Sequence, residues 1–312
     1  MSHHPYRTFR TTVARIQKLT PSFTRVTLTG DDLAHFGTDG LDQRIKLIIP
    51  FADGTITDVG QFDETQSMTE WYRRWRELPA EERNPIRTYT IRSPRPADRE
   101  IDVDFVLHGT EGPASAWATG AQVGDPLFVV GPDSRSDEQG GGIEWKPGDA
   151  TSVLIAGDET AMPAICSIVE SLPAHITGEV CIEVPSEADA VPLAAPEGVR
   201  VSWLGRGSTA HGVRLSAAVH AWGRRRGASS ASAHGAEPVR GLDEDDRPDA
   251  SDASDEILWE VPEAASGGEY AWLAGEAGTI TALRRHLVRD LGIDRHSIAF
   301  MGYWRRGRAE AS

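Results

Sequence analysis

One short stretch in the N-terminal half combines a cation, an aromatic ring and hydroxyl groups. It reads Arg87-Thr88-Tyr89-Thr90-Ile91-Arg92. A flavin dinucleotide site needs a cation for the diphosphate, a ring beside the isoalloxazine and a hydrogen-bonding group near its redox-active nitrogen. Because side chains alternate along a strand, Arg87 and Tyr89 share one face, while Thr90 offers its hydroxyl and backbone. An ordinary solvated strand is the alternative interpretation.

Two further segments complete this candidate site. They are DFVLHG, from Asp104 to Gly109, and GPASAW, from Gly112 to Trp117. Gly112 to Ser115 predicts the start of a short helix, whose N–H groups can face a phosphate. The alternative to a cofactor contact is a structural role for His108 and a position in the hydrophobic core for Trp117. The candidate cofactor ligands in these segments are Val106, His108, Gly112, Ala114 and Ser115.

The surrounding sequence predicts an antiparallel β-barrel. Short β-forming runs follow one another from Arg10 to about Pro132, and Gly, Pro and Asp residues separate them. A helical insertion is expected from Thr69 to Leu78. We therefore expect a flavin domain at residues 1–132, followed by a polar, glycine-rich linker at residues 133–149. The runs cover residues 11–19, 24–30, 43–50, 86–94, 101–109 and 125–132.

The second half has βαβ patterning. The apolar run TSVLIAGD precedes a helix-like stretch from Met162 to Leu172, and EVCIEV and VRVSWLG read as the next strands. Further helices are expected at Leu215–Arg225 and Thr279–Leu291, with strands at YAWLAG and SIAFMGYW. This pattern predicts a doubly wound parallel sheet in a nicotinamide-binding domain at residues 150–312.

A segment within this half, residues 227–256, is short of apolar residues and dense in Ser, Ala, Asp and Glu. Such a composition cannot bury enough surface to offset the entropy of ordering. We expect this segment to be a disordered insert.

The carboxyl ends of the predicted parallel strands carry a second set of candidates. Parallel sheets bind ligands at this edge, and the stretch from Gly157 to Ala161 places Asp158 and Thr160 there, before a helix. Asp158 and its neighbour Glu159 have helix capping as their alternative role. Glu276 follows a later strand and is the third candidate.

The choice between two nicotinamide donors stays open at this edge. Glu183 lies at the end of its strand and could accept a ribose hydroxyl, which favours NADH. Arg206 directly follows the next predicted strand, VRVSWLG, and could bind a 2′-phosphate, which favours NADPH.

The motifs RTYTIR, DVDFVLHG, GPASAWA, GD and VVGP, in this order, resemble the flavin domain of the siderophore-interacting protein family, a branch of the ferredoxin-reductase-like flavoproteins. The motifs LIAGDETAMPAI, EVP, WLGRG, WLAGEAGTITALRRHL and GYWRRGR continue the resemblance. It implies an FAD-dependent reductase that passes electrons from NADH or NADPH to a ferric siderophore, with no resident metal and no catalytic acid or base. One departure is the lack of the cysteine that related reductases often carry near Gly275–Gly278.

An anionic ferric complex needs local positive charge, because the chain has a net charge of −15. The candidate substrate ligands are Lys46, Arg305 and Arg306, in segments shared with the family, and Arg135 just after VVGP. The alternative for each is an ordinary solvated charge.

The net charge, the apolar content and the cysteine spacing of the sequence exclude several other classes of protein. The acidic balance disfavours a nucleic-acid partner, and the absence of a long apolar stretch predicts a cytoplasmic protein without membrane insertion. Cys166 and Cys181 lack the spacing of a metal or dithiol motif and are expected to be buried thiols. A monomer suffices. Two alternatives stay open, namely a flavin reductase with ferredoxin or flavodoxin as partner and a flavin-free siderophore-binding protein.

Overall fold

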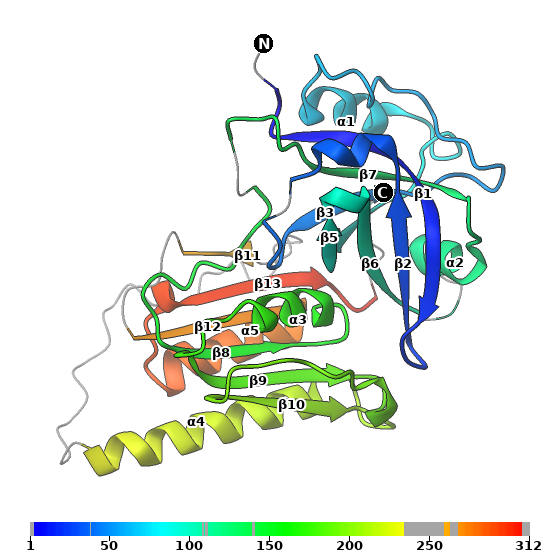
Figure 1. Ribbon diagram of the computed structural model, residues 1–312. Helices are drawn as coiled ribbons and strands as arrows, with labels where there is room; N and C mark the ends of the chain where they lie inside the picture. Colours follow the sequence, from blue (N-terminus) through cyan, green and yellow to red (C-terminus); the bar gives the residue numbers. More distant parts are fainter. Residues whose placement is uncertain are drawn as a thin grey trace.

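The computed structural model describes residues 3–37, 39–107, 109, 112–138, 141–233, 259–262 and 268–307, with backbone alone for residues 229–233. Its strands form two sheets, one in each half of the chain (Figure 1). Short 3₁₀ helices at Asp31–His35, Pro96–Asp98, Glu187–Asp189 and Arg295–Ser297 join the larger elements.

The first sheet has seven strands in the order β4-β3-β7-β1-β2-β6-β5, and every neighbouring pair is antiparallel. Ile91 and Arg92 lie between the two edge strands; the Ile91 N–H donates to the Gln43 carbonyl and the Arg92 N–H to the Asp102 carbonyl. The sheet therefore curls into a half-barrel, and the predicted antiparallel flavin-domain architecture is confirmed. The strands are β1 (Tyr6–Lys18), β2 (Phe23–Thr29), β3 (Arg44–Ile48), β4 (Ile86–Thr90), β5 (Ser93–Arg95), β6 (Glu100–Val106) and β7 (Pro126–Pro132).

The predicted helical insertion is α1 (Met68–Glu77). Ser67 and Glu70 form a capping box at its start, which satisfies N–H groups that lack an intrahelical acceptor. Trp71 and Trp75 are buried against the half-barrel, and the Trp75 indole N–H donates to the Asn84 carbonyl at 2.9 Å. The helix thus fixes the segment that leads into β4.

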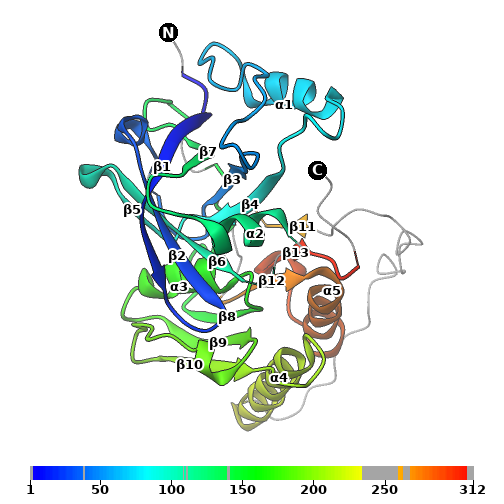
Figure 2. The same ribbon diagram turned by 90° about the vertical axis from the view of Figure 1, so that its right-hand side faces the viewer.

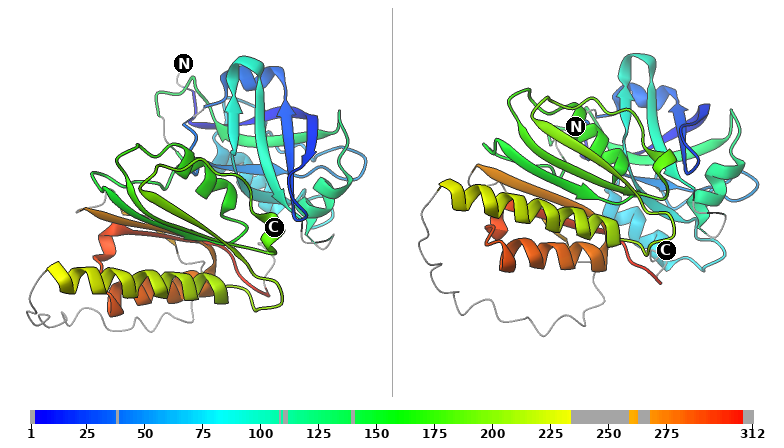
Figure 3. Two further views of the ribbon diagram at one scale, coloured as in Figure 1. Left: turned by 60° about the horizontal axis from the view of Figure 1, so that its bottom comes forward. Right: turned by 90° about the horizontal axis from the view of Figure 1, so that it is seen from below.

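The second sheet has the strand order β10-β9-β8-β12-β13-β11. Its first five strands are parallel, and β11 (Trp259–Glu260) is an antiparallel edge strand. Helix α3 (Met162–Glu170) covers one face, and α4 (Val213–Ala233) and α5 (Ala277–Arg285) cover the other (Figure 3). The predicted doubly wound sheet is confirmed. The parallel strands are β8 (Ser152–Gly157), β9 (Thr177–Val184), β10 (Val199–Gly205), β12 (Glu269–Glu276) and β13 (Ile298–Trp304).

The order of these strands reverses between β8 and β12, because the chain crosses from one side of the sheet to the other there. In open α/β sheets such a switch point leaves a crevice beyond the carboxyl ends of the two strands. Asp158 follows β8 directly, and Glu276 ends β12. The fold thus brings together two residues that are far apart in sequence.

The structure differs from the sequence prediction at the start of the proposed insert. Helix α4 continues through residues 227–233, where disorder was expected. A helix that is already nucleated gains one hydrogen bond for each residue it adds, and ion pairs of Arg225 with Glu179 and Arg226 with Glu269 anchor this part of α4. Residues 234–256 of the insert lie outside the described residues. In the part of the chain that is described, every helix is too short or too polar to cross a membrane.

The segment predicted as a linker packs against both sheets. Trp145 is buried, with its ring 5.2 Å from that of Tyr270 on β12. Asp42, which precedes β3, accepts hydrogen bonds from the Trp145 N–H at 3.1 Å and from the Trp272 indole N–H at 3.2 Å. One buried carboxylate therefore joins the half-barrel, the segment 133–149 and the parallel sheet.

Asp42 gives a prediction on pH dependence. Burial raises its pKa from 3.8 to about 6, so folding favours the protonated form. The stability that this group contributes is complete below the unfolded-state pKa and is lost as pH rises through about 6. We expect the wild type to lose roughly 2–3 kcal/mol of unfolding free energy between pH 4 and pH 7 through this group. Urea titrations should show a flatter profile for Asp42→Asn. An equal change in the Asp31→Asn control, whose side chain is 96% exposed, would contradict this assignment.

Candidate functional site

A cavity of about 830 Å³ lies between the half-barrel and the parallel sheet. Its first wall comes from β4, β6 and the start of α2 (Pro113–Gly120). Its second wall comes from the segments that follow β8 and β10, from β11, and from the end of β13 with the residues after it. Figure 2 shows how the elements of the two halves of the chain are arranged. Cavities of a few hundred to about 1,000 Å³ are the usual size of cofactor sites.

The β4 motif lies on the first wall of the cavity. Arg87, Tyr89 and Thr90 all line the cavity. The Tyr89 ring packs against Phe105 of β6, with ring centroids 4.7 Å apart, so the core of the half-barrel supports it. A cation, an aromatic ring and a hydroxyl group thus reach one cavity from a single strand.

The start of α2 faces the same cavity. Gly112 is the N-cap and Pro113 occupies the first turn, where its missing N–H costs no hydrogen bond. The Ser115 hydroxyl donates to the Gly109 carbonyl at 2.7 Å, and a side chain built at Gly112 would meet no atom within 4 Å. The helix N-terminus is therefore accessible to an anionic group. The predicted ligands Val106, Gly112, Ala114 and Ser115 all line the cavity, whereas His108 lies outside the described residues.

This first wall fits FAD. The diphosphate of FAD needs a cation and N–H donors, which Arg87 and the α2 N-terminus supply. The isoalloxazine needs a flat apolar neighbour, which Tyr89 supplies.

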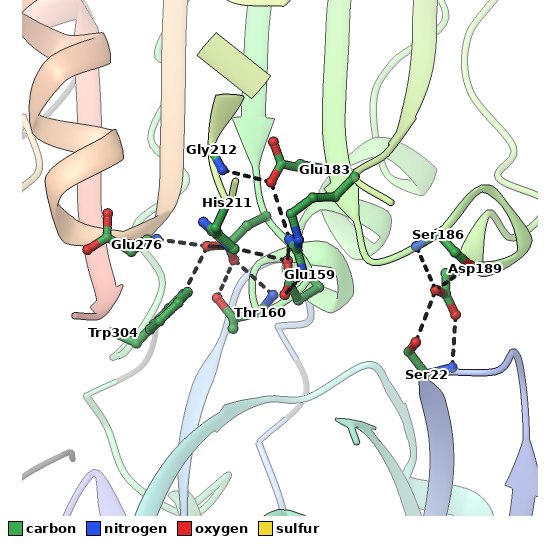
Figure 4. A network of polar contacts seen from close by, with 12 residues as sticks. Ser22, Glu159, Thr160, Glu183, Ser186, Asp189, His211, Gly212, Glu276 and Trp304 are labelled. Atoms are coloured by element: carbon green, nitrogen blue, oxygen red, sulfur yellow. Dashed lines mark hydrogen bonds and ion pairs between the residues drawn. The ribbon is translucent and has the colours of Figure 1, made fainter. Parts of the chain in front are cut away.

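At the switch point, Asp158 differs from the other predicted cofactor ligands; the residues that donate hydrogen bonds to it, Thr160, Glu276 and Trp304, are labelled in Figure 4. Its carboxylate is 1% exposed and does not line the cavity. It accepts hydrogen bonds from the Thr160 N–H at 2.9 Å, the Glu276 N–H at 2.8 Å and the Trp304 indole at 2.9 Å. Asp158 thus joins the ends of β8, β12 and β13. Burial and repulsion from Glu159 raise its pKa.

Thr160 and Glu276, the other two candidates at this edge, also separate. Thr160 lines the cavity. Glu276 does not: it is the N-cap of α5 and accepts from the Thr279 N–H at 2.8 Å. Although burial raises the pKa of Glu276, hydrogen bonds from the backbone N–H groups of Thr279 and Gly278 bring it below its usual value. Its carboxylate therefore positions a helix rather than contacting a ligand in the cavity.

Next to Asp158 lies a buried ionic cluster of Glu159, Arg206 and His211, all of which line the cavity. The Arg206 guanidinium donates to both Glu159 carboxylate oxygens, at 2.8 and 2.9 Å. His211 Nε2 lies 3.4 Å from oxygens of Asp158 and Glu159. Burial would raise the pKa of Glu159, but His211 and Arg206 lower it to about 2. Burial by itself would lower the pKa of His211. The neighbouring carboxyl groups of Glu159 and Asp158 have the larger effect and raise this pKa.

The ligand atoms of Asp158, Glu159 and His211 are close enough to share a metal ion. However, the guanidinium of Arg206 already covers both oxygens of Glu159, and N–H and O–H donors occupy those of Asp158. The cluster is therefore organised as an ion-pair network.

Glu183 belongs to the same network and is not available to a ribose. It is 0% exposed and accepts from the N–H groups of Gly212 and Leu215 at the start of α4. Its remaining contact is with Arg206 at 3.2 Å. The proposed ribose acceptor is thus a helix cap, because the carboxylate satisfies N–H donors that lack intrahelical partners.

The aromatic side chains at one end of the cavity, Trp259, Tyr303 and Trp304, were not among the residues predicted from the sequence. Trp259 of β11 stacks on Tyr303 of β13, with ring centroids 5.9 Å apart and an interplanar angle of 19°. The Arg44 guanidinium lies 4.3 Å from the Trp259 ring centroid, and Trp304 contacts His211 edge to face. The pair Tyr303-Trp304 at a strand end was the available signal.

The four substrate candidates are divided by the structure. Arg306 lines the cavity, whereas Arg305 does not. Lys46 lies beside the cavity: its Nζ is 3.4 Å from the hydroxyl of Thr88, which lines the cavity. Arg135 is not brought to the cavity, because its guanidinium pairs with Asp133 at 2.6 Å and Glu64 at 3.0 Å.

The two cysteines take no part in the site. Cys166 and Cys181 are both buried thiols, as the sequence predicts, and burial raises the pKa of each to about 12.

Comparison with known proteins agrees with this arrangement. Residues 12–136 match the siderophore-interacting FAD-binding domain, and residues 150–307 match siderophore-interacting protein. An uncharacterized protein of Mycobacterium tuberculosis is 33% identical over 99% of this chain and 94% of its own length. The ferric vibriobactin reductase ViuB of Vibrio cholerae is 29% identical over 92% of this chain and 85% of its own length.

Among solved structures, the siderophore-interacting protein SipS of Aeromonas hydrophila superposes with a TM-score of 0.66 and 27% identity, over 97% of this chain and 93% of SipS. The family matches begin and end close to the first and last strands of the two sheets. The resemblance noted in the sequence is therefore confirmed, and the chain belongs to the siderophore-interacting protein family, with its FAD-binding domain at the N-terminal end.

Proposed function

We propose that this protein is an FAD-dependent reductase that passes electrons from NADH or NADPH to a ferric siderophore. The observation that carries the proposal is the two-walled cavity. Its half-barrel wall fits FAD, and its other wall is the carboxyl edge of a parallel sheet, where α/β folds bind nucleotides. The similarity to a protein named as a ferric vibriobactin reductase supports the choice of acceptor.

Each wall has its own role in this proposal. Arg87 and the start of α2 bind the FAD diphosphate, and Tyr89 and Thr90 position its ring. Bound FAD supplies a carrier that takes two electrons from a nicotinamide and releases them singly. On the opposite wall Thr160 faces the donor, while Asp158 and Glu276 hold the strand ends in place. These side chains bind and orient, and none needs to act as an acid or base.

The direct test is spectroscopic. Purified protein should show the absorbance of oxidised flavin, which should bleach anaerobically on addition of NADH or NADPH and return when a ferric siderophore is added. Protein that carries no flavin would instead favour a siderophore-binding protein. Flavin that only reduced ferredoxin could bleach would favour the protein-linked reductase.

The proposed siderophore end gives a second prediction. Arg306 lines the cavity and Lys46 adjoins it, so their charges should attract an anionic ferric complex. Replacing both with glutamine should raise the apparent KM for an anionic ferric siderophore severalfold at low ionic strength, and less at high ionic strength. Arg135→Gln serves as the control, because Arg135 is paired away from the cavity. Slowed reduction of FAD by nicotinamide, with normal iron reduction by prereduced protein, would assign Lys46 and Arg306 to the donor site instead.

A further inference from the structure

The donor edge of the cavity holds a guanidinium whose two terminal nitrogens already contact carboxylates. Arg206 directly follows β10, and β10 pairs with β9 up to Gly205 and Val184. Its two terminal nitrogens bind the two carboxylate oxygens of Glu159, in the paired geometry in which an arginine would bind a phosphate. One of these nitrogens also contacts Glu183. The side chains of Arg206, Glu159 and Glu183 are 15%, 3% and 0% exposed, so water screens this network little.

NADPH differs from NADH by a 2′-phosphate, and dinucleotide-binding sheets hold that phosphate with an arginine near the end of the second strand. In this sheet β9 is the second strand, and Arg206 lies next to its end. A 2′-phosphate would have to displace Glu159 from Arg206 and leave a buried carboxylate unpaired, which is unfavourable.

The local charge opposes the phosphate as well. The carboxyl groups of Asp158, Glu159 and Glu183 surround the guanidinium of Arg206 and the imidazole of His211. A phosphate dianion bound at Arg206 would therefore lie beside acidic groups that repel it.

The other arginine that lines this wall lies too far along the sheet to replace Arg206. Arg306 lies two residues past the end of β13, and the strands β8 and β12 lie between β13 and β9 in the sheet. Its backbone N–H lies near Glu276 at the start of α5. Of the two described arginines on this wall of the cavity, Arg206 is therefore the one placed to meet a phosphate near the end of β9.

We infer that Glu159 determines the choice of donor: by occupying Arg206 it makes this protein accept NADH and disfavour NADPH. The inference rests on the proposed function, since it concerns the donor of the same reductase. Glu183 cannot take over this role: it contacts one terminal nitrogen of Arg206 and leaves the other to Glu159, because its carboxylate also accepts from the start of α4.

The kinetic test compares the two donors. In anaerobic stopped-flow reduction of bound flavin, the wild type should show a kcat/KM for NADH at least about tenfold above that for NADPH, the size of one charge-assisted phosphate contact. Glu159→Gln keeps the shape of the side chain but removes the charge that pairs with both terminal nitrogens of Arg206, and should raise kcat/KM for NADPH by about tenfold with little change for NADH. The control Glu187→Gln removes an exposed carboxylate at the same edge and should leave the ratio unchanged.

A binding test needs no turnover. Calorimetric titration with 2′,5′-ADP and 5′-AMP should show no gain from the 2′-phosphate in the wild type, and about tenfold tighter binding of 2′,5′-ADP by Glu159→Gln. Adding Arg206→Gln to that variant should abolish the gain. Unchanged melting temperature and flavin spectrum would verify that the variants are folded.

A wild type that prefers NADPH, or a Glu159→Gln variant that binds 2′,5′-ADP no better than the wild type does, would overturn the inference. A flavin that accepts electrons from neither nucleotide would contradict the proposed donor instead, and the titration would then decide the role of Glu159 by itself.

Discussion

Replacing Arg87 with alanine is expected to weaken FAD binding by about ten- to a hundredfold. Arg87 lies on β4 and lines the cavity opposite the parallel sheet, close in the chain to Tyr89 and Thr90 on the same wall. A charge-assisted hydrogen bond to phosphate is worth about 1.5–3 kcal/mol, which gives this range of affinity. The fold should survive, because the backbone pairing of β4 with β3 does not involve the side chain.

The affinity is measured by titrating flavin-free protein with FAD and following the quenching of flavin fluorescence. Arg76→Ala is the matched control, since it removes an exposed arginine of α1 that does not line the cavity. Arg87→Ala protein that retains FAD as tightly as the control would remove Arg87 from the proposed site.

The predicted residues that line the cavity are those that a few consecutive residues of the chain place together. Arg87, Tyr89 and Thr90 belong to one strand, and Gly112, Ala114 and Ser115 to one helix start. Alternation along a strand and the exposed N–H groups of a helix start are properties of a few consecutive residues. The fold was predictable for a similar reason, because short alternating runs and βαβ spacing determine the pairing of strands.

The parts that the sequence did not predict depend on pairs of residues that are distant in the chain. Glu159 and Arg206 are 47 residues apart, and Asp158 and Trp304 are 146 apart. A polar residue at a strand end resembles a ligand until the donors of neighbouring strands are known. Arg135 had a local signal, because Asp133 lies two residues before it and pairs with it.

Replacing Asp158 with alanine is expected to destabilise the protein by about 3–5 kcal/mol. The carboxylate is the shared acceptor for the Glu276 N–H and the Trp304 indole, and Thr160 donates both its N–H and its hydroxyl to it. Each buried donor left without an acceptor costs about 1–3 kcal/mol. Removal of a buried charge beside Glu159 offsets part of this cost, since repulsion between the two carboxylates disappears.

Thermal unfolding followed by circular dichroism should place the melting temperature of Asp158→Ala roughly 10 °C below that of the wild type. Asp53→Ala is the matched control: Asp53 accepts the same pair of bonds from Thr55, two residues on, but is exposed and ties no strands together. FAD affinity should change little, because the residues proposed to hold FAD lie on the half-barrel and α2. A variant with the melting temperature of the control but with FAD affinity or donor kinetics lowered tenfold would show instead that Asp158 contacts a ligand, as the sequence alone suggested.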